Sequence, residues 1–265
     1  MILLAGALVG YVLLVVASYF YQDRLLYFPE ITTQDQMAQA AAQRGLALWP
    51  GGTDDPYGLV SASPPAQSKG TVLIWHGNGG AAQHRSFYLQ PLQALGYRVV
   101  LLEYPGYAAR PGRPGEAALI GDALQAARRA QADFGGPLYV WGESLGCGVA
   151  SAVAADPALD VRGAVMLTPW DDLPSVAQRH YGYLPARWLT RDKYDNVANL
   201  ARFPGPVAVL MAGQDQVIPN PHTLRLYESL PEPKRLWVFE HAGHNTWPAG
   251  PREAWWAEVM DWLNR

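Results

Sequence analysis

The segment Gly142-Glu143-Ser144-Leu145-Gly146 constrains the fold most, because it joins two patterns of opposite kind. The apolar run Pro137–Trp141 before it is typical of a buried strand, and the small residues of Leu145–Ala155 after it predict a helix. Glycines two positions before and after a serine let a strand turn sharply into a helix, where larger side chains would collide. The segment therefore predicts a strand–turn–helix unit that holds Ser144 at the turn in a strained backbone.

Short apolar strands alternate with amphipathic helices along most of the chain. We expect strands at Leu46–Trp49, Tyr57–Ala62, Thr71–Trp75, Arg98–Leu102, Leu138–Trp141, Ala164–Leu167, Val207–Met211 and Leu236–Phe239. We expect helices at Thr33–Arg44, Ala81–Leu95, Gly115–Phe134, Leu145–Ala155, Pro221–Ser229 and Arg252–Leu263. This alternation predicts an α/β fold with a mostly parallel central sheet and helices on both faces. It pauses at about residues 169–201, after the sixth expected strand, and we interpret that aromatic-rich stretch as a cap insertion.

The N-terminal stretch Met1–Phe20 carries no charged side chain. Twenty helical residues rise about 30 Å, the thickness of the hydrocarbon core of a bilayer. We interpret residues 1–22 as an uncleaved single-pass membrane anchor and residues 23–265 as one folded domain. A cleaved signal peptide and a buried core helix remain alternatives, although the positive region that a signal peptide needs is missing. Arg24 on the C-terminal flank favours a cytoplasmic domain, but the side of the membrane stays open.

Composition argues against several classes of function. The formal net charge of −3 and the lack of a long basic run argue against a nucleic-acid partner. The single cysteine, Cys147, excludes an internal disulfide framework, and the six histidines lack metal-ligand spacing. We expect no metal and no cofactor, and nothing indicates the oligomeric state. Cys147 itself is interpreted as a small buried side chain, with a redox-sensitive thiol as the alternative.

Asp215 and His244, in the C-terminal part of the chain, are the candidate partners of Ser144 in a catalytic triad. A serine hydroxyl is a weak nucleophile until a base takes its proton, and a third group must orient that base. Asp215 and His244 each follow an expected strand, so both belong to the edge of the sheet that carries Ser144. Gly243 directly before His244 allows a close loop that presents the imidazole. We predict Ser144, Asp215 and His244 as the catalytic residues, in the order serine, acid, histidine.

Alternatives exist for the acid and the base. Asp171 and Asp172 follow an earlier expected strand, a position from which some hydrolases draw their acid, but the tight loop after the next strand favours Asp215. His241 lies three residues before His244 and is an alternative base or an ordinary surface or core histidine.

Backbone N–H groups are expected to bind the negative oxygen of a tetrahedral intermediate. The N–H of Leu145, directly after the serine, is one predicted donor. The other lies in the glycine-rich loop His76-Gly77-Asn78-Gly79-Gly80, where Asn78 is the predicted donor. A purely structural role and a phosphate-binding role are the alternatives for this loop, although no G-K-[ST] follows it.

Together these motifs resemble the α/β-hydrolase superfamily, and the resemblance covers nearly the whole chain. An apolar N-terminus followed by Tyr21–Pro29, with Thr168–Leu173 and Tyr194-Asp195-Asn196, is similar to the membrane-anchored α/β-hydrolase-domain proteins, which are related to a serine aminopeptidase-like group. One departure is the loop Asn78-Gly79-Gly80, where relatives often have alanine in the second position.

The resemblance implies an α/β-hydrolase fold and a serine hydrolase that forms an acyl-enzyme. An ester or thioester is the favoured substrate, either a small molecule, an acyl lipid or an acylated protein, and some relatives cleave palmitoyl thioesters from proteins. Within the cap, Tyr181, Tyr183, Leu184 and Trp188 are predicted to line an apolar acyl pocket, or else only to pack the cap on the core.

Other functions stay open on the same fold. A serine peptidase or amidase and a perhydrolase would use the same three residues. A binding protein without activity is a further alternative, although such proteins usually lose a member of the triad and this chain keeps all three. Haloalkane dehalogenases and epoxide hydrolases of similar architecture carry aspartate where this chain has Ser144.

Overall fold

An eight-stranded sheet with the order β10-β9-β8-β7-β4-β6-β3-β2 forms the centre of the protein. This computed structural model describes residues 2–265, and Met1, the first residue of the expected anchor, lies outside the described range. The strands are β2 (Leu46–Trp49), β3 (Gly58–Ser61), β4 (Thr71–Trp75), β6 (Arg98–Leu102), β7 (Leu138–Glu143), β8 (Val161–Leu167), β9 (Val207–Ala212) and β10 (Lys234–Phe239). β3 is antiparallel to its neighbours β2 and β6, and all other neighbouring strands are parallel. The predicted, mostly parallel sheet is confirmed.

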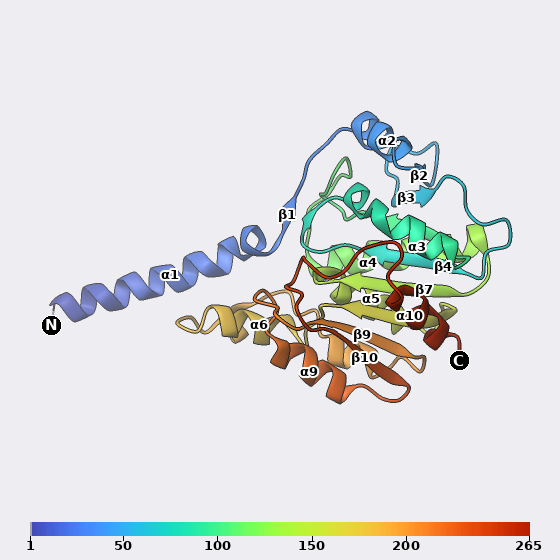
Figure 1. Ribbon diagram of the computed structural model, residues 1–265. Helices are drawn as coiled ribbons and strands as arrows, with labels where there is room; N and C mark the ends of the chain where they lie inside the picture. The colour runs from blue at the N-terminus through green and yellow to red at the C-terminus, as the bar shows by residue number, and fades with distance from the viewer. Residues whose placement is uncertain (1) are drawn as a thin grey trace.

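Helices cover both faces of this sheet (Figure 1). Successive side chains of a strand point to opposite faces, so in β4 Leu73 and Trp75 join one apolar core while Val72 and Ile74 join the other. The first core is covered by α4 (Glu116–Phe134), α5 (Leu145–Ala154), α8 (Asn196–Leu200) and α9 (Asn220–Ser229). The second is covered by α2 (Gln34–Ala42), η1 (Ala82–Tyr88), α3 (Leu89–Ala94) and α10 (Trp255–Leu263). The expected arrangement of helices on both faces is therefore confirmed.

The single helix expected over Ala81–Leu95 is instead two elements, the 3₁₀ helix η1 and the α-helix α3. Pro91 explains the break, because a proline inside a helix lacks the N–H donor and its ring collides with the carbonyl four residues earlier. In the structure Pro91 lies in the first turn of α3, where neither problem arises.

The stretch between β8 and β9 forms three short helices, α6 (Leu173–His180), α7 (Ala186–Leu189) and α8. We call residues 169–201 the cap. Within it, the start of α6 is fixed by Asp172, whose carboxylate accepts a hydrogen bond from the Ser175 N–H at 2.8 Å and caps the helix. The Trp170 indole donates to the carbonyl of Tyr194 at 3.1 Å and so ties the two ends of the cap together.

The N-terminal helix α1 (Ile2–Leu26) continues past residue 22, where we expected the anchor to end. It projects away from the sheet on the side where α6 lies (Figure 1). The span Leu3–Leu26 is long and apolar enough to cross a membrane, and the structure buries none of it. An apolar helix of this length could therefore span a bilayer.

A second, two-stranded sheet went unpredicted. In it β1 (Phe28–Pro29) pairs in parallel with β5 (Gly79–Gly80), and Phe28 N–H donates to the carbonyl of Asn78 at 2.9 Å. Only Tyr27 separates α1 from β1. The N-terminal helix is thus joined almost directly to the glycine-rich loop that follows β4.

Candidate active site

Ser144 stands at the sharp turn between β7 and α5, as the sequence predicted. Its backbone has φ +53° and ψ −114°, a conformation that residues other than glycine rarely adopt. A Cβ atom at Gly142 would lie 2.4 Å from Cys147 Cα, and one at Gly146 would lie 2.0 Å from the Trp75 carbonyl oxygen. Because neither site has room for a Cβ, both glycines are needed for the strand and helix to pass this closely.

The structure brings Ser144, His244 and Asp215 into one hydrogen-bonded chain. His244 Nε2 lies 2.9 Å from Ser144 Oγ, and His244 Nδ1 lies 2.7 Å from Asp215 Oδ2. The other carboxylate oxygen of Asp215 accepts hydrogen bonds from the N–H groups of Val217 and Ile218, each at 2.8 Å. Both side chains behind the serine are nearly buried, at 9% exposure for His244 and 2% for Asp215. This geometry suits proton transfer from the serine to the imidazole, with the carboxylate fixing the ring.

The alternative acids and base lie elsewhere. Asp171 accepts hydrogen bonds from His222 and Arg225, each at 2.7 Å. Burial alone would raise the pKa of Asp171, but these two hydrogen bonds hold it below its ordinary value. Asp172 caps α6, and His241 is exposed to solvent. Among these candidates only His244 contacts Ser144, and only Asp215 contacts His244.

Asn78 and Leu145 line the same cavity as Ser144, as expected of oxyanion donors. The Asn78 carbonyl accepts from Phe28 N–H and from the Tyr107 hydroxyl at 2.8 Å, and its side-chain amide donates to the carbonyl of Leu26 at 2.8 Å. Within the described residues, the Asn78 N–H donates no hydrogen bond. The Leu145 N–H belongs to the first turn of α5, which has no carbonyl partners inside the helix. Both donors are therefore available to a ligand oxygen.

A buried pair beneath the glycine-rich loop was not foreseen. His76 Nε2 lies 2.9 Å from Glu103 Oε1, and both side chains are almost completely buried. The second carboxylate oxygen of Glu103 accepts from Ala82 N–H at 2.8 Å, and the Tyr104 hydroxyl donates to the carbonyl of His76 at 2.5 Å. Glu103 thus connects His76, the first residue of the loop, to Ala82, the first residue of η1. The signal that could have revealed it is a charged residue placed directly after an apolar strand.

Glu143, directly before Ser144, forms a bidentate ion pair with Arg85. Arg85 donates from Nε and from one terminal nitrogen to the two oxygens of Glu143, each at 3.0 Å. The two side chains are 18% and 10% exposed, so the pair is largely shielded from water. Arg85 belongs to η1, and the ion pair therefore connects η1 to the turn that carries Ser144. Nothing in the sequence around Arg85 pointed to this role.

Cys147 is buried in the first turn of α5. Its thiol lies 3.2 Å from the carbonyl oxygen of Gly142 and 3.3 Å from that of Leu167. Burial raises the pKa of this thiol well above its ordinary value, so the side chain stays neutral. That agrees with the predicted buried side chain and not with a redox-sensitive thiol. Residues 2–265 contain no group of three or more His, Cys, Asp or Glu side chains that could hold a metal ion.

A cavity of about 520 Å³ opens at Ser144 between the cap and α1. Of the four predicted pocket residues, Tyr181, Tyr183 and Leu184 line it. Trp188 does not line the cavity and is 85% exposed, so this expectation is corrected. The reason is helical geometry, because Ala186 and Leu189 of α7 face the cavity and a residue between them points to the opposite side.

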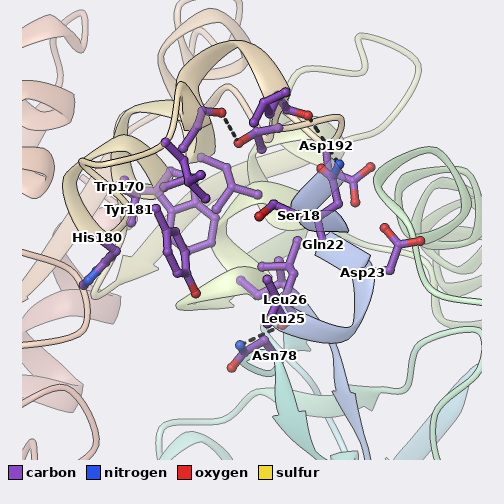
Figure 2. A pocket seen from close by; sticks show the side chains of 18 of the residues that line it. Ser18, Gln22, Asp23, Leu25, Leu26, Asn78, Trp170, His180, Tyr181 and Asp192 are labelled. Carbon is purple, nitrogen blue, oxygen red and sulfur yellow. Dashed lines mark hydrogen bonds between the residues drawn. The ribbon is translucent and has the colours of Figure 1, made fainter. Parts of the chain in front are cut away.

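The second wall of this cavity comes from α1, which sequence reasoning assigned only to anchoring. Figure 2 shows Ser18 and Leu25 of α1 on one side and Trp170 and Tyr181 of the cap on the other. The hydroxyl of Ser144 therefore faces a mainly apolar space enclosed by two parts of the chain that are far apart in sequence.

Comparison of the sequence with known proteins identifies the family of this chain. Residues 70–203 match the family described as alpha/beta hydrolase fold. An uncharacterized protein of Mycobacterium tuberculosis is 33% identical over 238 residues, covering 84% of this chain and 80% of that protein. Lysophosphatidylserine lipase ABHD12 of Danio rerio is 30% identical over 184 residues, covering 62% of this chain but only 48% of the lipase. This chain thus matches about half of the length of that lipase.

Solved structures agree on the fold. The esterase Pf2001 of Pyrococcus furiosus superposes with a TM-score of 0.61 at 18% identity, covering 75% of this chain and 81% of the esterase. A monoacylglycerol lipase of Paleococcus ferrophilus gives a TM-score of 0.57 at 19% identity, covering 76% of this chain and 96% of the lipase. This chain belongs to the α/β-hydrolase superfamily, as a hydrolase of the ABHD type whose relatives include lipases and esterases.

Proposed function

We propose that this hydrolase is a serine esterase that cleaves acyl esters or thioesters, acyl lipids in particular, through an acyl-enzyme on Ser144. The observation that carries the proposal is the hydrogen-bonded chain of Ser144, His244 and Asp215 at the inner end of an apolar cavity. Residues 23–265 would form the catalytic domain with the cap at 169–201, and α1 would anchor it to a membrane. Arg24 after the apolar stretch favours a cytoplasmic domain.

Each residue has a defined role in the proposed reaction. His244 Nε2 takes the proton of Ser144 while Oγ attacks the ester carbonyl, and Asp215 stabilises the imidazolium. The N–H groups of Asn78 and Leu145 donate to the oxygen that becomes negative. His244 then gives its proton to the departing alcohol or thiol, which leaves an acyl group on Ser144. A water molecule, deprotonated by His244, hydrolyses this acyl-enzyme and restores the serine.

The preference for lipid esters over peptides rests on two observations. The cavity beside Ser144 is lined mainly by apolar side chains, and such pockets favour apolar ligands. One relative is a lysophosphatidylserine lipase, and two structural neighbours are an esterase and a monoacylglycerol lipase. An amidase would use the same triad, but neither observation favours it.

The test is labelling of the detergent-solubilised protein with a fluorescent fluorophosphonate. Wild type should be labelled and Ser144→Ala should not, while Ser63→Ala, which removes an exposed serine in a loop, should label like wild type. Hydrolysis of p-nitrophenyl butyrate should fall about a million-fold in Ser144→Ala, as it does when the nucleophile of such a triad is removed. Label on Ser144→Ala would place the nucleophile elsewhere. Absence of label from all three proteins would favour a binding protein without activity.

A further inference from the structure

One face of α1 belongs to the cavity at Ser144. Leu14, Ser18, Gln22, Leu25 and Leu26 all line it. Their spacing places them along a single side of a helix, because residues three or four apart are neighbours on its surface. Val16 and Phe20, on the opposite side of the helix, do not line the cavity. The helix therefore presents one strip to the cavity and the remaining apolar surface to its surroundings.

The cap is fastened to α1 at two levels. Near the middle of the helix, the Tyr11 hydroxyl donates to the carbonyl of Tyr183 at 3.1 Å. Near its C-terminal end, Gln22 Oε1 accepts from the N–H of Arg191 at 2.7 Å, and the guanidinium of Arg191 pairs with Asp23. The cavity-lining side chains of α1 include two that lie between these levels, Leu14 and Ser18. The space between helix and cap is thus a structured passage with a wall on each side.

The reacting end of this passage lies at the C-terminus of α1. The Leu26 carbonyl accepts a hydrogen bond from the side chain of Asn78, the predicted oxyanion residue. From Leu26 to Leu14 the helix rises about 18 Å, at 1.5 Å for each residue. One leaflet of a bilayer has a hydrocarbon depth of about 15 Å. A chain that starts at Ser144 and follows α1 to Leu14 would therefore run through the depth of one leaflet.

The cap presents large aromatic side chains to the outside along the same stretch. Tyr183, beside Tyr11, is 64% exposed, and Trp188 is 85% exposed. Exposed aromatic side chains of this size can pack against lipid, because their rings are large and apolar. The outer surface of the cap is therefore suited to contact lipid beside α1.

We propose that α1 is one wall of an acyl-chain channel, and that the acyl chain of a membrane lipid enters sideways between α1 and the cap. The proposal rests on the esterase function proposed for Ser144. The carbonyl of the lipid reaches Ser144 near the membrane surface while its tail remains beside Ser18 and Leu14. The helix thus selects substrates by acyl length as well as anchoring the protein.

The experiment compares three tryptophan variants of the full chain in detergent micelles. Ser18→Trp and Leu14→Trp each place an indole in the channel, and Leu14 is one helical turn farther from Ser144. Val16→Trp is the matched control, because it adds the same indole to the side of α1 that does not line the cavity. The probes are p-nitrophenyl esters of four, eight, twelve and sixteen carbons, with kcat/KM measured for each.

Wild-type kcat/KM should rise with chain length by up to roughly fourfold for each methylene that enters the channel. Ser18→Trp should stop this rise at a shorter chain than Leu14→Trp does, and Val16→Trp should follow wild type. An indole that displaces three methylenes should lower kcat/KM for the longest ester by roughly 50-fold. The ordered cut-off between the two channel variants would not arise from a general loss of folding.

Two results would overturn the channel. In one, Ser18→Trp and Leu14→Trp follow wild type at every length, so the acyl chain does not pass along α1. In the other, both variants lose the same factor at every length, so the helix acts only on the integrity of the fold. Failure of the proposed function would look different, because wild type would then hydrolyse no ester of any length and take no fluorophosphonate label.

Discussion

Gly146 shows how little space surrounds the serine, since an added Cβ would meet the backbone of Trp75 rather than a movable side chain. We expect Gly146→Ala to lower the free energy of unfolding by about 3 kcal/mol, because a strand and a helix must separate to admit the methyl group. Gly121→Ala in α4 is the control, since nothing lies within 4 Å of a Cβ there. That change should raise stability by up to about 1 kcal/mol through helix propensity. Urea unfolding of both variants measures the difference, and equal stability would contradict the close packing.

Single residues were predictable where one local pattern was enough. Ser144, Asp215 and His244 each follow an apolar run, and parallel strands bring their C-terminal ends to one edge. The pairing of His76 with Glu103 was not predictable in the same way. Each follows its own strand, and the two meet because β4 and β6 are neighbours in register, with Trp75 opposite Leu102. Strand order is a property of the whole sheet, and the sequence does not state it locally.

At the scale of elements, the ion pair of Arg85 with Glu143 joins η1 to the turn at Ser144. We expect Arg85→Ala to destabilise the fold by about 3–5 kcal/mol, because it leaves a buried carboxylate without its partner. Arg129→Ala removes an exposed pair with Asp133 on α4, and its expected cost is about 0.3–0.5 kcal/mol. Thermal unfolding of the two variants compares these costs. Similar losses would mean that the Glu143 pair behaves as an ordinary surface pair.

Elements were predictable where a run of residues was long enough to show an apolar pattern. Long periodic segments such as α4 begin and end close to their expected limits. The short strands β1 and β5 have two residues each, which is too few for any repeating pattern. Their pairing depends on where the chain leaves α1, and no local feature of Phe28 or Gly79 indicates it. The contribution of α1 to the cavity was missed for another reason. The helix is apolar on all sides, so its sequence does not show which side contacts the cap.

For the whole molecule, the expectation is that α1 holds the protein in a membrane. Full-length protein should remain with membranes through extraction in alkaline carbonate, because its apolar helix would be buried in hydrocarbon. Deletion of residues 2–22 should release it to the supernatant, and fluorophosphonate labelling of the released protein would show that the triad is intact. Continued sedimentation of the deleted form with membranes would show that other surfaces, such as the exposed aromatic residues of the cap, hold the protein.

The single residue between α1 and β1 fixes the position of α1 relative to the rest of the protein. Tyr27 is buried, its hydroxyl donates to Asp192 at 2.5 Å and it lies 2.9 Å from the hydroxyl of Tyr194. No slack therefore exists between the helix and the loop of Asn78. If α1 lies across a bilayer, Ser144 lies at one fixed height above it, and the esterase proposed here would act at that height only. The enzyme would then select its substrates by position. Only an ester carbonyl at that same distance from the plane of the bilayer would reach Ser144.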